Sequence, residues 1–192
     1  MPYDPEIHHR RSIRLRGYDY SQPGKYSVTI CTQNKEHLFG EVVEGEMHRN
    51  ELGDYVALCL EWLPRQYPYV DLDEWIVMPN HLHGIIVITD RRGGSRPAPT
   101  LISGDDCPAA PPLNSVDVSP TAPTKRKTLG SLVGAFKTVS TDWRNQQLGT
   151  PGAVMWQRDF YDHIVRNEDE LNKIREYIRT NPLQWDTDPD FT

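Results

Sequence analysis

Two histidines, His81 and His83, lie one residue apart in the stretch EWIVMPNHLHGIIVIT, residues 74–89. The apolar runs on both sides are typical of buried strands, where a titratable pair is unfavourable unless something holds it there. Side chains alternate between the two faces of a strand, so both imidazoles point to one face and Leu82 to the other. Two imidazoles on one face are able to share one metal ion, but a third ligand must come from elsewhere.

The segment RNEDELNKIREYIRTNP, residues 166–182, predicts a helix that supplies this ligand. At about 100° per residue its buried stripe consists of Leu171, Ile174 and Ile178. Tyr177 and Asn181 are four residues apart at the edge of this stripe, so their side chains emerge together. If the helix crosses the histidine strand, Asn181 completes a His-His-amide metal site. Tyr177 then stands beside the metal.

A tyrosine beside a metal ion indicates attack on a phosphodiester. A phenol with a pKa near 10 is a poor nucleophile at neutral pH unless its target is polarised. A divalent ion bound to a non-bridging phosphate oxygen provides that polarisation. The expected product is a covalent tyrosyl phosphate, which keeps the phosphate activated. Cleavage and strand transfer are then two directions of one reaction.

The same residues also fit plainer roles. Two histidines at a turn are often satisfied by hydrogen bonds alone, and Asn181 before Pro182 is an ordinary helix end. Tyr161 is the rival nucleophile, but it lies in a predicted strand with no amide one helical turn away. We therefore favour Tyr177. We expect His163 to be structural.

The periodicity along the rest of the chain predicts an α+β fold. Strands are predicted at 25–33, 37–43, 69–79, 81–89 and 153–165, and helices at 51–68, 128–147 and 166–182. We expect the second strand to be the hairpin partner of the first. Asn50 and Asn167 are the predicted N-caps, and Pro64 and Pro182 mark helix ends. The element order predicts a ferredoxin-like antiparallel sheet of the split βαβ type, with helices packed on one face plus a C-terminal catalytic helix.

The length of 192 residues fits one domain with appendages. Residues 1–24 form a basic N-terminal arm, residues 25–182 the domain, and residues 183–192 a C-terminal tail. Residues 91–127 hold seven of the sixteen prolines and show almost no periodic pattern. We predict that they form a disordered insertion within the domain.

The net charge of −6 argues against general binding of nucleic acid, since phosphate binding draws on lysine and arginine. The basic residues are nevertheless clustered. One group is in the N-terminal arm and a second precedes the second helix: Arg10, Arg11, Arg14 and Arg16, then Lys125, Arg126 and Lys127. We expect both groups to bind DNA, with Tyr18 stacking on unpaired bases. Solvated surface charge is the alternative for each group.

Cys31, Cys59 and Cys107 are widely spaced and odd in number, so they form neither a disulfide framework nor a CxxC metal site. We predict two core thiols and, at Cys107, one loop thiol. No apolar run approaches the length of a membrane span, and the N-terminus lacks the pattern of a secretory signal. We expect a cytoplasmic protein that does not associate with membranes.

Several motifs resemble the REP-associated tyrosine transposases, a group within the HUH single-tyrosine transposases. Their HUH strand, histidine-hydrophobic-histidine, is similar to PNHLHGIIVI, and their catalytic helix is similar to YIRTNP. Their entry strand resembles RRSIRLRGYDYSQPGKYSVTICT, and two further segments fit the family, SLVGAFKTVST and WQRDFYDHIVRN. The resemblance covers nearly all parts of the chain that are predicted to be ordered. The Pro-rich insertion departs from the compact family pattern.

This resemblance implies an enzyme that cleaves and rejoins single-stranded DNA at palindromic, REP-like hairpins. It implies Mg²⁺ or Mn²⁺ as the metal, a 5′-phosphotyrosine intermediate and release of a 3′-hydroxyl. The positions that match the family are His81, His83 and Asn181 as metal ligands and Tyr177 as the nucleophile. A homodimer is left open, because related enzymes can place the tyrosine helix of one subunit in the site of the other.

Two other functions were weighed. A histidine-triad nucleotide hydrolase also has alternating histidines on a strand, but it requires a third histidine where this chain has Ile85. A domesticated, non-catalytic regulator that binds hairpin DNA is the remaining alternative. Binding without a metal-dependent covalent adduct would distinguish it from the enzyme.

Overall fold

The computed structural model describes residue 15 and residues 17–90 and 126–185. Its main sheet has four strands in the order β4-β5-β1-β6, and all neighbours are antiparallel. The strands are β1 Gly24–Cys31, β4 Val70–Met78, β5 His81–Ile88 and β6 Tyr161–Val165. The helices are α1 Glu51–Gln66, α2 Leu129–Leu148 and α3 Glu168–Gln184. With α1 between β1 and β4 and α2 between β5 and β6, this is the expected ferredoxin-like arrangement.

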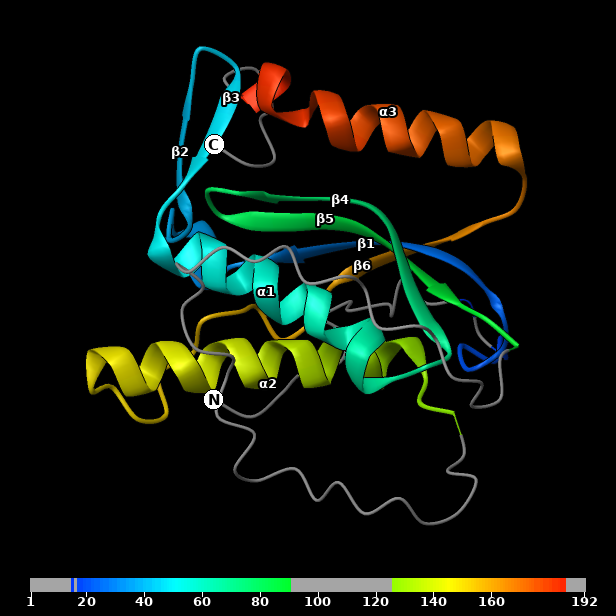
Figure 1. The fold of residues 1–192 in the computed structure, drawn as a ribbon, viewed down its shortest axis with the longest axis horizontal. Coiled ribbons are helices and arrows are strands. Elements are labelled where there is room, and N and C mark those ends of the chain that lie inside the picture. The colour runs from blue at the N-terminus through cyan, green and yellow to red at the C-terminus, as the bar shows by residue number, and fades with distance from the viewer. Residues whose placement is uncertain (1–14, 16, 91–125, 186–192) are drawn as a thin grey trace, which may run out of the picture.

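Helices cover both faces of this sheet (Figure 1). The helices α1 and α2 lie on one face, over the main core, whose largest fully buried side chains include Tyr26, Leu60 and Phe136. The helix α3 lies on the other face and closes a smaller core around Ile85 and Ile178. The shared face predicted for the helices is therefore confirmed for α1 and α2, and the C-terminal helix packs opposite them.

The helices begin within two residues of the predicted starts, and α1 and α3 run past the prolines predicted to mark their ends. The side chains of Asn50 and Asn167 accept hydrogen bonds from the backbone N–H groups of residues 53 and 170, so both N-caps are confirmed. Pro64 and Pro182 lie inside α1 and α3, and each helix continues for two residues. A proline lacks only its own N–H, and the carbonyl of Leu63 still accepts a hydrogen bond from Tyr67.

The predicted strand at 37–43 pairs differently from the expectation. The part that forms a strand, β2 Gly40–Val43, pairs with β3 Glu46–Arg49 in a separate two-stranded sheet, not with β1. Glu44 and Gly45 both have positive φ, 53° and 80°, which is the backbone of the two-residue turn that joins tightly paired strands. A short 3₁₀ turn, η1 Gln33–Lys35, separates β1 from this hairpin.

The predicted strand at 153–165 is shorter than expected. Only β6, Tyr161–Val165, is paired, and Trp156 forms an isolated bridge with Thr32. Upstream of β6 the chain turns into the core, where the buried indole of Trp156 donates a hydrogen bond to Ser140 at 2.9 Å. The ammonium group of Lys137 donates to backbone carbonyls of residues 157–159. These contacts replace a strand ladder.

Other expectations concern single residues and terminal segments. Cys31 and Cys59 are buried free thiols, as predicted. Cys107, residues 1–14 and nearly all of the predicted insertion lie outside the described residues. Within the described part, none of the helices is long and apolar enough to cross a membrane.

Candidate active site

Strand β5 places both histidines under α3. His81 pairs with Cys31 and His83 with Thr29 of the neighbouring strand. Because strand residues alternate, Leu82 enters the main core and the two imidazoles lie on the α3 side, with ring centroids 4.6 Å apart. The histidines are 0% and 4% exposed, so the predicted shared face is confirmed and both rings are withdrawn from water.

The Nδ1 atom of each ring contacts an oxygen atom. Nδ1 of His81 lies 2.8 Å from Oδ1 of Asn80, and Nδ1 of His83 lies 2.8 Å from the hydroxyl of Thr29. An amide oxygen only accepts, so His81 donates from Nδ1 and its lone pair is at Nε2. The amide nitrogen of Asn80 donates to the carbonyl of Lys35, which fixes the orientation of this amide. The atom of His81 that could bind a metal ion is therefore Nε2.

Burial keeps both histidines neutral. Desolvation lowers the pKa of His83 to about 4. Desolvation also lowers the pKa of His81, further than that of His83, and the charge of His83 adds to the effect. Neutral imidazoles are the form that binds metal ions, so the pair is ready to ligate at neutral pH without losing a proton.

Helix α3 brings Tyr177 and Asn181 to the histidines, as the helical spacing predicts. The ring of Tyr177 meets His83 edge to face, with centroids 5.2 Å apart, and 39% of the tyrosine is exposed. Asn181 is 3% exposed, and its side chain lies close enough to His81 to affect the pKa of that imidazole. The four residues that the sequence analysis selected therefore form one cluster, with the tyrosine on its solvent side.

Trp185 closes the buried end of this cluster. Its ring lies nearly parallel to that of His81, with centroids 6.0 Å apart, and it also contacts His37 at 5.3 Å. Trp185 is 8% exposed although the predicted domain ends at residue 182. The segment just past Pro182 thus shields His81 from solvent.

A pair of acidic residues on β4 holds α3 in place. The pairing of β4 with β5 shifts register between Leu72 and Trp75, and Asp73 and Glu74 lie within this irregularity. The carboxylate of Asp73 accepts two hydrogen bonds from the guanidinium group of Arg175, each 2.7 Å long. This bidentate contact lowers the pKa of Asp73.

A second arginine repeats the contact one helical turn later. Nε of Arg179 donates to Glu74 at 2.7 Å. The two arginines flank Tyr177 in sequence, so each end of its helical turn is fixed to β4. The small apolar core beneath α3 is thereby supplemented by two charged contacts that set the height of the tyrosine over β5.

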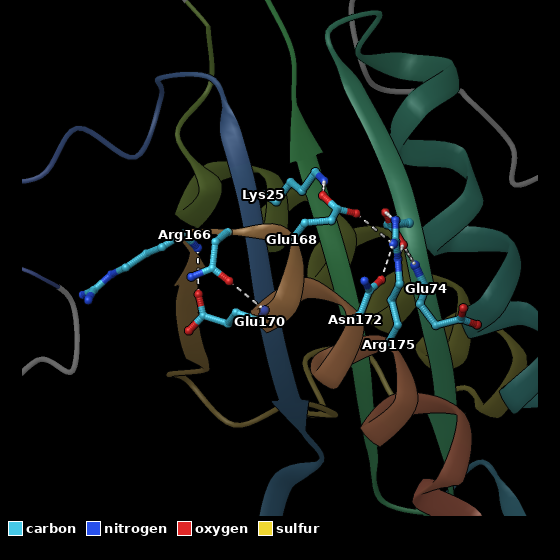
Figure 2. A network of polar contacts seen from close by, with 9 residues as sticks. Lys25, Glu74, Arg166, Glu168, Glu170, Asn172 and Arg175 are labelled. Atoms are coloured by element: carbon cyan, nitrogen blue, oxygen red, sulfur yellow. Dashed lines mark hydrogen bonds and ion pairs between the residues drawn. The ribbon is translucent and has the colours of Figure 1, made fainter.

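The N-terminal turn of α3 is fixed by a further polar network (Figure 2). Glu168 lies between Lys25 of β1 and Arg175, and each cation is 3.3 Å away. Glu170 accepts a hydrogen bond from the backbone N–H of Arg166 at 2.7 Å and pairs with His163. His163 therefore has a structural contact, as expected. Because these groups are exposed, each pair contributes little stability.

The donor atoms of this cluster suit a divalent ion. Across the described ranges no three His, Cys, Asp or Glu side chains are grouped so as to hold a metal. An amide oxygen can also ligate a metal ion, and Asn181 is the buried amide beside His81. Two neutral imidazoles suit a divalent transition metal better than Mg²⁺, which prefers oxygen ligands, and the amide oxygen also suits Mn²⁺.

The residues predicted to bind DNA lie away from this cluster or outside the described residues. Arg10, Arg11, Arg14, Arg16 and Lys125 fall outside. Tyr18 packs edge to face on Tyr20 and Tyr26, with centroids 5.0 and 6.4 Å away. Arg126 forms an ion pair with Asp90, and the ammonium group of Lys127 lies over the ring of Tyr67. These two cations precede α2, on the face opposite α3 (Figure 1).

Sequence reasoning missed four contributors to the site, namely Asn80, Trp185, Asp73 and Glu74. Asn80 lies directly before the histidine motif, and this position was the available signal. Trp185 followed a proline that was taken as the end of the helix. The contacts of Asp73 and Glu74 with α3 join residues about a hundred positions apart. Local periodicity cannot predict such pairs.

The chain is 39% identical over 188 residues to an uncharacterized protein of Haemophilus influenzae. The alignment covers 97% of this chain and 95% of the relative. The chain belongs to the family of this Haemophilus protein. No family model matches it.

Two solved structures resemble the chain. One is a REP-associated tyrosine transposase bound to a REP hairpin, with a TM-score of 0.51 and 17% identity over 89% of this chain and 73% of that one. The other is a candidate transposase of Deinococcus radiodurans R1, with a TM-score of 0.45 and 17% identity over 86% of this chain and 95% of that one. The fold of this family is thus that of the REP-associated tyrosine transposase, as the sequence motifs indicated.

Proposed function

We propose that this protein is a metal-dependent nickase and strand transferase for single-stranded DNA, in which Tyr177 is the nucleophile. The observation that carries the proposal is the cluster itself. A half-exposed tyrosine lies against one of two buried, neutral histidines, and a buried amide contacts the other. Neither a turn pair of histidines nor an ordinary helix end requires these four side chains to meet.

His81, His83 and Asn181 would hold the ion, with Mg²⁺ and Mn²⁺ as the candidates. A bound divalent cation would withdraw charge from a non-bridging oxygen of the scissile phosphate. The chain orients the ligands in advance, because Asn80 and Thr29 hold the two imidazole rings through Nδ1. Trp185 and the apolar core under α3 keep water from the buried side of the ligands.

Tyr177 performs the covalent step. Its phenolic oxygen attacks phosphorus, a bond between this oxygen and the 5′-phosphate forms, and the bond from phosphorus to the 3′-oxygen breaks. The phenolic proton is lost and the departing 3′-oxygen takes up a proton, so the products are a 5′-phosphotyrosine and a 3′-hydroxyl. Attack by a 3′-hydroxyl on this intermediate reverses the step and rejoins the strands. The exposed position of Tyr177 admits the polymer substrate from solvent.

Hairpin DNA is the substrate that we propose. The transposase with a similar fold was solved bound to a REP hairpin, which supports a palindromic target for this chain. Helix α3 packs on the sheet of its own chain, so the proposed site is complete within one protomer (Figure 1). We therefore propose that cleavage uses the tyrosine and the histidines of the same protomer.

The experiment uses end-labelled single strands of the DNA that flanks the gene, chosen to include any short palindromes in it. Purified protein is incubated with them and Mn²⁺ or Mg²⁺, and the products are separated on a denaturing gel. We expect a covalent protein–DNA band that requires the metal and is absent from Tyr177→Phe and His83→Ala. Tyr161→Phe is the matched control, since it removes the hydroxyl of the rival, 57% exposed tyrosine, and should keep the band.

Two outcomes would overturn the proposal. A band that survives in Tyr177→Phe would move the nucleophile to another residue. Tight binding of the hairpin without any band would identify a non-catalytic regulator in place of the enzyme.

A further inference from the structure

Helix α3 covers only part of its face of the sheet. Its apolar side packs on β4 and β5, and its first turn contacts Lys25 of β1 and His163 of β6. Seven side chains of β1 and β6 lie on this face: Lys25, Ser27, Thr29, Cys31, Tyr161, His163 and Val165. Four of them, Ser27, Thr29, Tyr161 and His163, are here called the open strip, and His163 at its margin pairs with Glu170. Ser27 and Thr29 are partly exposed, and Tyr161 and His163 are exposed. A strip of strand surface therefore remains open to solvent beside the candidate site.

The open strip is continuous with the histidine pair. Thr29 pairs with His83 on one side and with Tyr161 on the other, so the three residues form one row across β5, β1 and β6. Residues paired in this way direct their side chains to the same face. The hydrogen bond between Thr29 and His83 confirms this for the first pair. At about 4.8 Å per strand, Tyr161 stands roughly 10 Å from His83 along the row.

The fold gives Tyr161 no packing role. It is 57% exposed, whereas Ile164 of the same strand packs against the main core from the opposite face. Two exposed arginines, Arg158 and Arg166, flank β6 in sequence, and Figure 2 shows the side chain of Arg166 extending into solvent. An exposed aromatic ring on a strand, with hydroxyl groups beside it and cations at its margins, suits a single nucleic-acid strand.

We propose that Tyr161 is a stacking platform for a base of single-stranded DNA that flanks the scissile phosphate. The strand lies along the row from Tyr161 over Thr29 to His83, and the phosphate reaches Tyr177 at its end. The DNA base stacks on the aromatic ring of Tyr161, and the hydroxyl group of Tyr161 takes no part in binding. Stacking of this kind tolerates any base, so Tyr161 contributes affinity and position without selecting a sequence. The location of the scissile phosphate rests on the proposed function, but the binding of a single strand does not.

The test measures binding of a fluorescein-labelled oligothymidine strand by fluorescence anisotropy in EDTA, where cleavage cannot occur. We expect Tyr161→Ala to weaken binding about tenfold, while Tyr161→Phe and Tyr161→Trp bind as the wild type does. Leu148→Ala is the control, because Leu148 is 60% exposed at the end of α2, on the opposite side of the sheet. Thermal unfolding of each variant checks that the fold is retained.

A photocrosslink gives a second readout. A strand containing 5-iododeoxyuridine should crosslink on irradiation to the peptide that carries Tyr161, as identified by mass spectrometry. The inference is overturned if Tyr161→Ala binds as tightly as the wild type, if Tyr161→Phe loses as much affinity as Tyr161→Ala, or if the crosslink lies elsewhere. A failure of the proposed function is seen separately, as absence of the covalent band in the wild type while the oligothymidine result stands.

Discussion

The rings of His83 and Tyr177 meet edge to face, with centroids 5.2 Å apart and an interplanar angle of 71°. One ring belongs to a buried strand and the other to a helix that begins after the last strand of the sheet. Their contact requires α3 to cross β5 at the position of His83. The tyrosine is therefore positioned by everything that fixes α3, namely the small apolar core, the pairs with Asp73 and Glu74, and the buried end at Trp185.

Substitution of Asn80 should weaken metal binding without touching a ligand. Its amide oxygen accepts the Nδ1 proton of His81, which leaves the lone pair at Nε2. We expect Asn80→Ala to lower Mn²⁺ affinity about 10- to 100-fold in titration calorimetry, the usual effect of losing a partner of a metal-binding histidine. Asn80→Asp keeps an acceptor and should retain most of the affinity.

The control for Asn80 is Asn145→Ala. Asn145 is also buried, but it lies on α2, where its amide donates to the carbonyl of Ala153. Both alanine variants should lower thermal stability, and only Asn80→Ala should lower Mn²⁺ affinity. Equal Mn²⁺ affinity in Asn80→Ala and the wild type would contradict the role assigned to this amide.

Stability of the metal-free protein should fall as the pH decreases below about 6.5. In the folded state burial lowers the pKa of His83 to about 4 and that of His81 further, from an ordinary value of 6.5. Between these values the unfolded chain binds protons that the folded chain does not. Each histidine therefore lowers the free energy of unfolding by about 1.4 kcal/mol per pH unit as the pH falls. The full contribution is present above pH 6.5.

Urea unfolding in EDTA between pH 4 and 7 measures this slope. The double variant His81→Gln/His83→Gln should have a shallower dependence on pH than the wild type. Asp73 also has a lowered pKa, and its loss of stability begins about one pH unit above its ordinary value of 3.8, so the slope above about pH 5 reports the histidines. The same slope in both proteins would mean that other groups control the acid sensitivity.

The main sheet and the four residues of the candidate site were predictable because both depend on local pattern. Alternation placed His81 and His83 on one face, and helical spacing placed Tyr177 and Asn181 together. The N-caps at Asn50 and Asn167 are also local, because each side chain accepts a hydrogen bond from the backbone N–H three residues later. In each case neighbours in sequence decide the geometry.

The hairpin β2–β3 and the supports of α3 were not predictable in this way. Pairing of β2 with β3 follows from positive φ at Glu44, a residue with no special preference for that conformation. The contact between Asp73 and Arg175 depends on an irregularity in β4 and on the path of α3 across it. Neither leaves a periodic signal, because each arises from the folded arrangement of distant segments.

The pair Asp73–Arg175 should be coupled more strongly than an exposed ion pair. Its side chains are 19% and 26% exposed, and the contact is bidentate. A double-mutant cycle with Asp73→Ala and Arg175→Ala, followed by urea unfolding, should give a coupling energy of about 1–3 kcal/mol. The cycle for Glu61 and Arg65, which are 3.9 Å apart on α1 and more exposed, should give less than about 0.5 kcal/mol. Equal coupling energies in the two cycles would contradict the role of Arg175 in holding α3 on β4.

Two glycines in helices should respond in opposite directions to alanine. A Cβ at Gly53 of α1 would collide with the carbonyl oxygen of Phe39, which is held by the backbone N–H of Asn50 at 3.0 Å. Because that carbonyl cannot move freely, Gly53→Ala should destabilise the protein by about 1–3 kcal/mol. A Cβ at Gly134 of α2 meets nothing within 4 Å, so Gly134→Ala should stabilise by about 0.5–1 kcal/mol through helix propensity. Urea unfolding of both variants gives the two signs, and a gain in stability at Gly53 would contradict the close approach of α1 to the loop before β2.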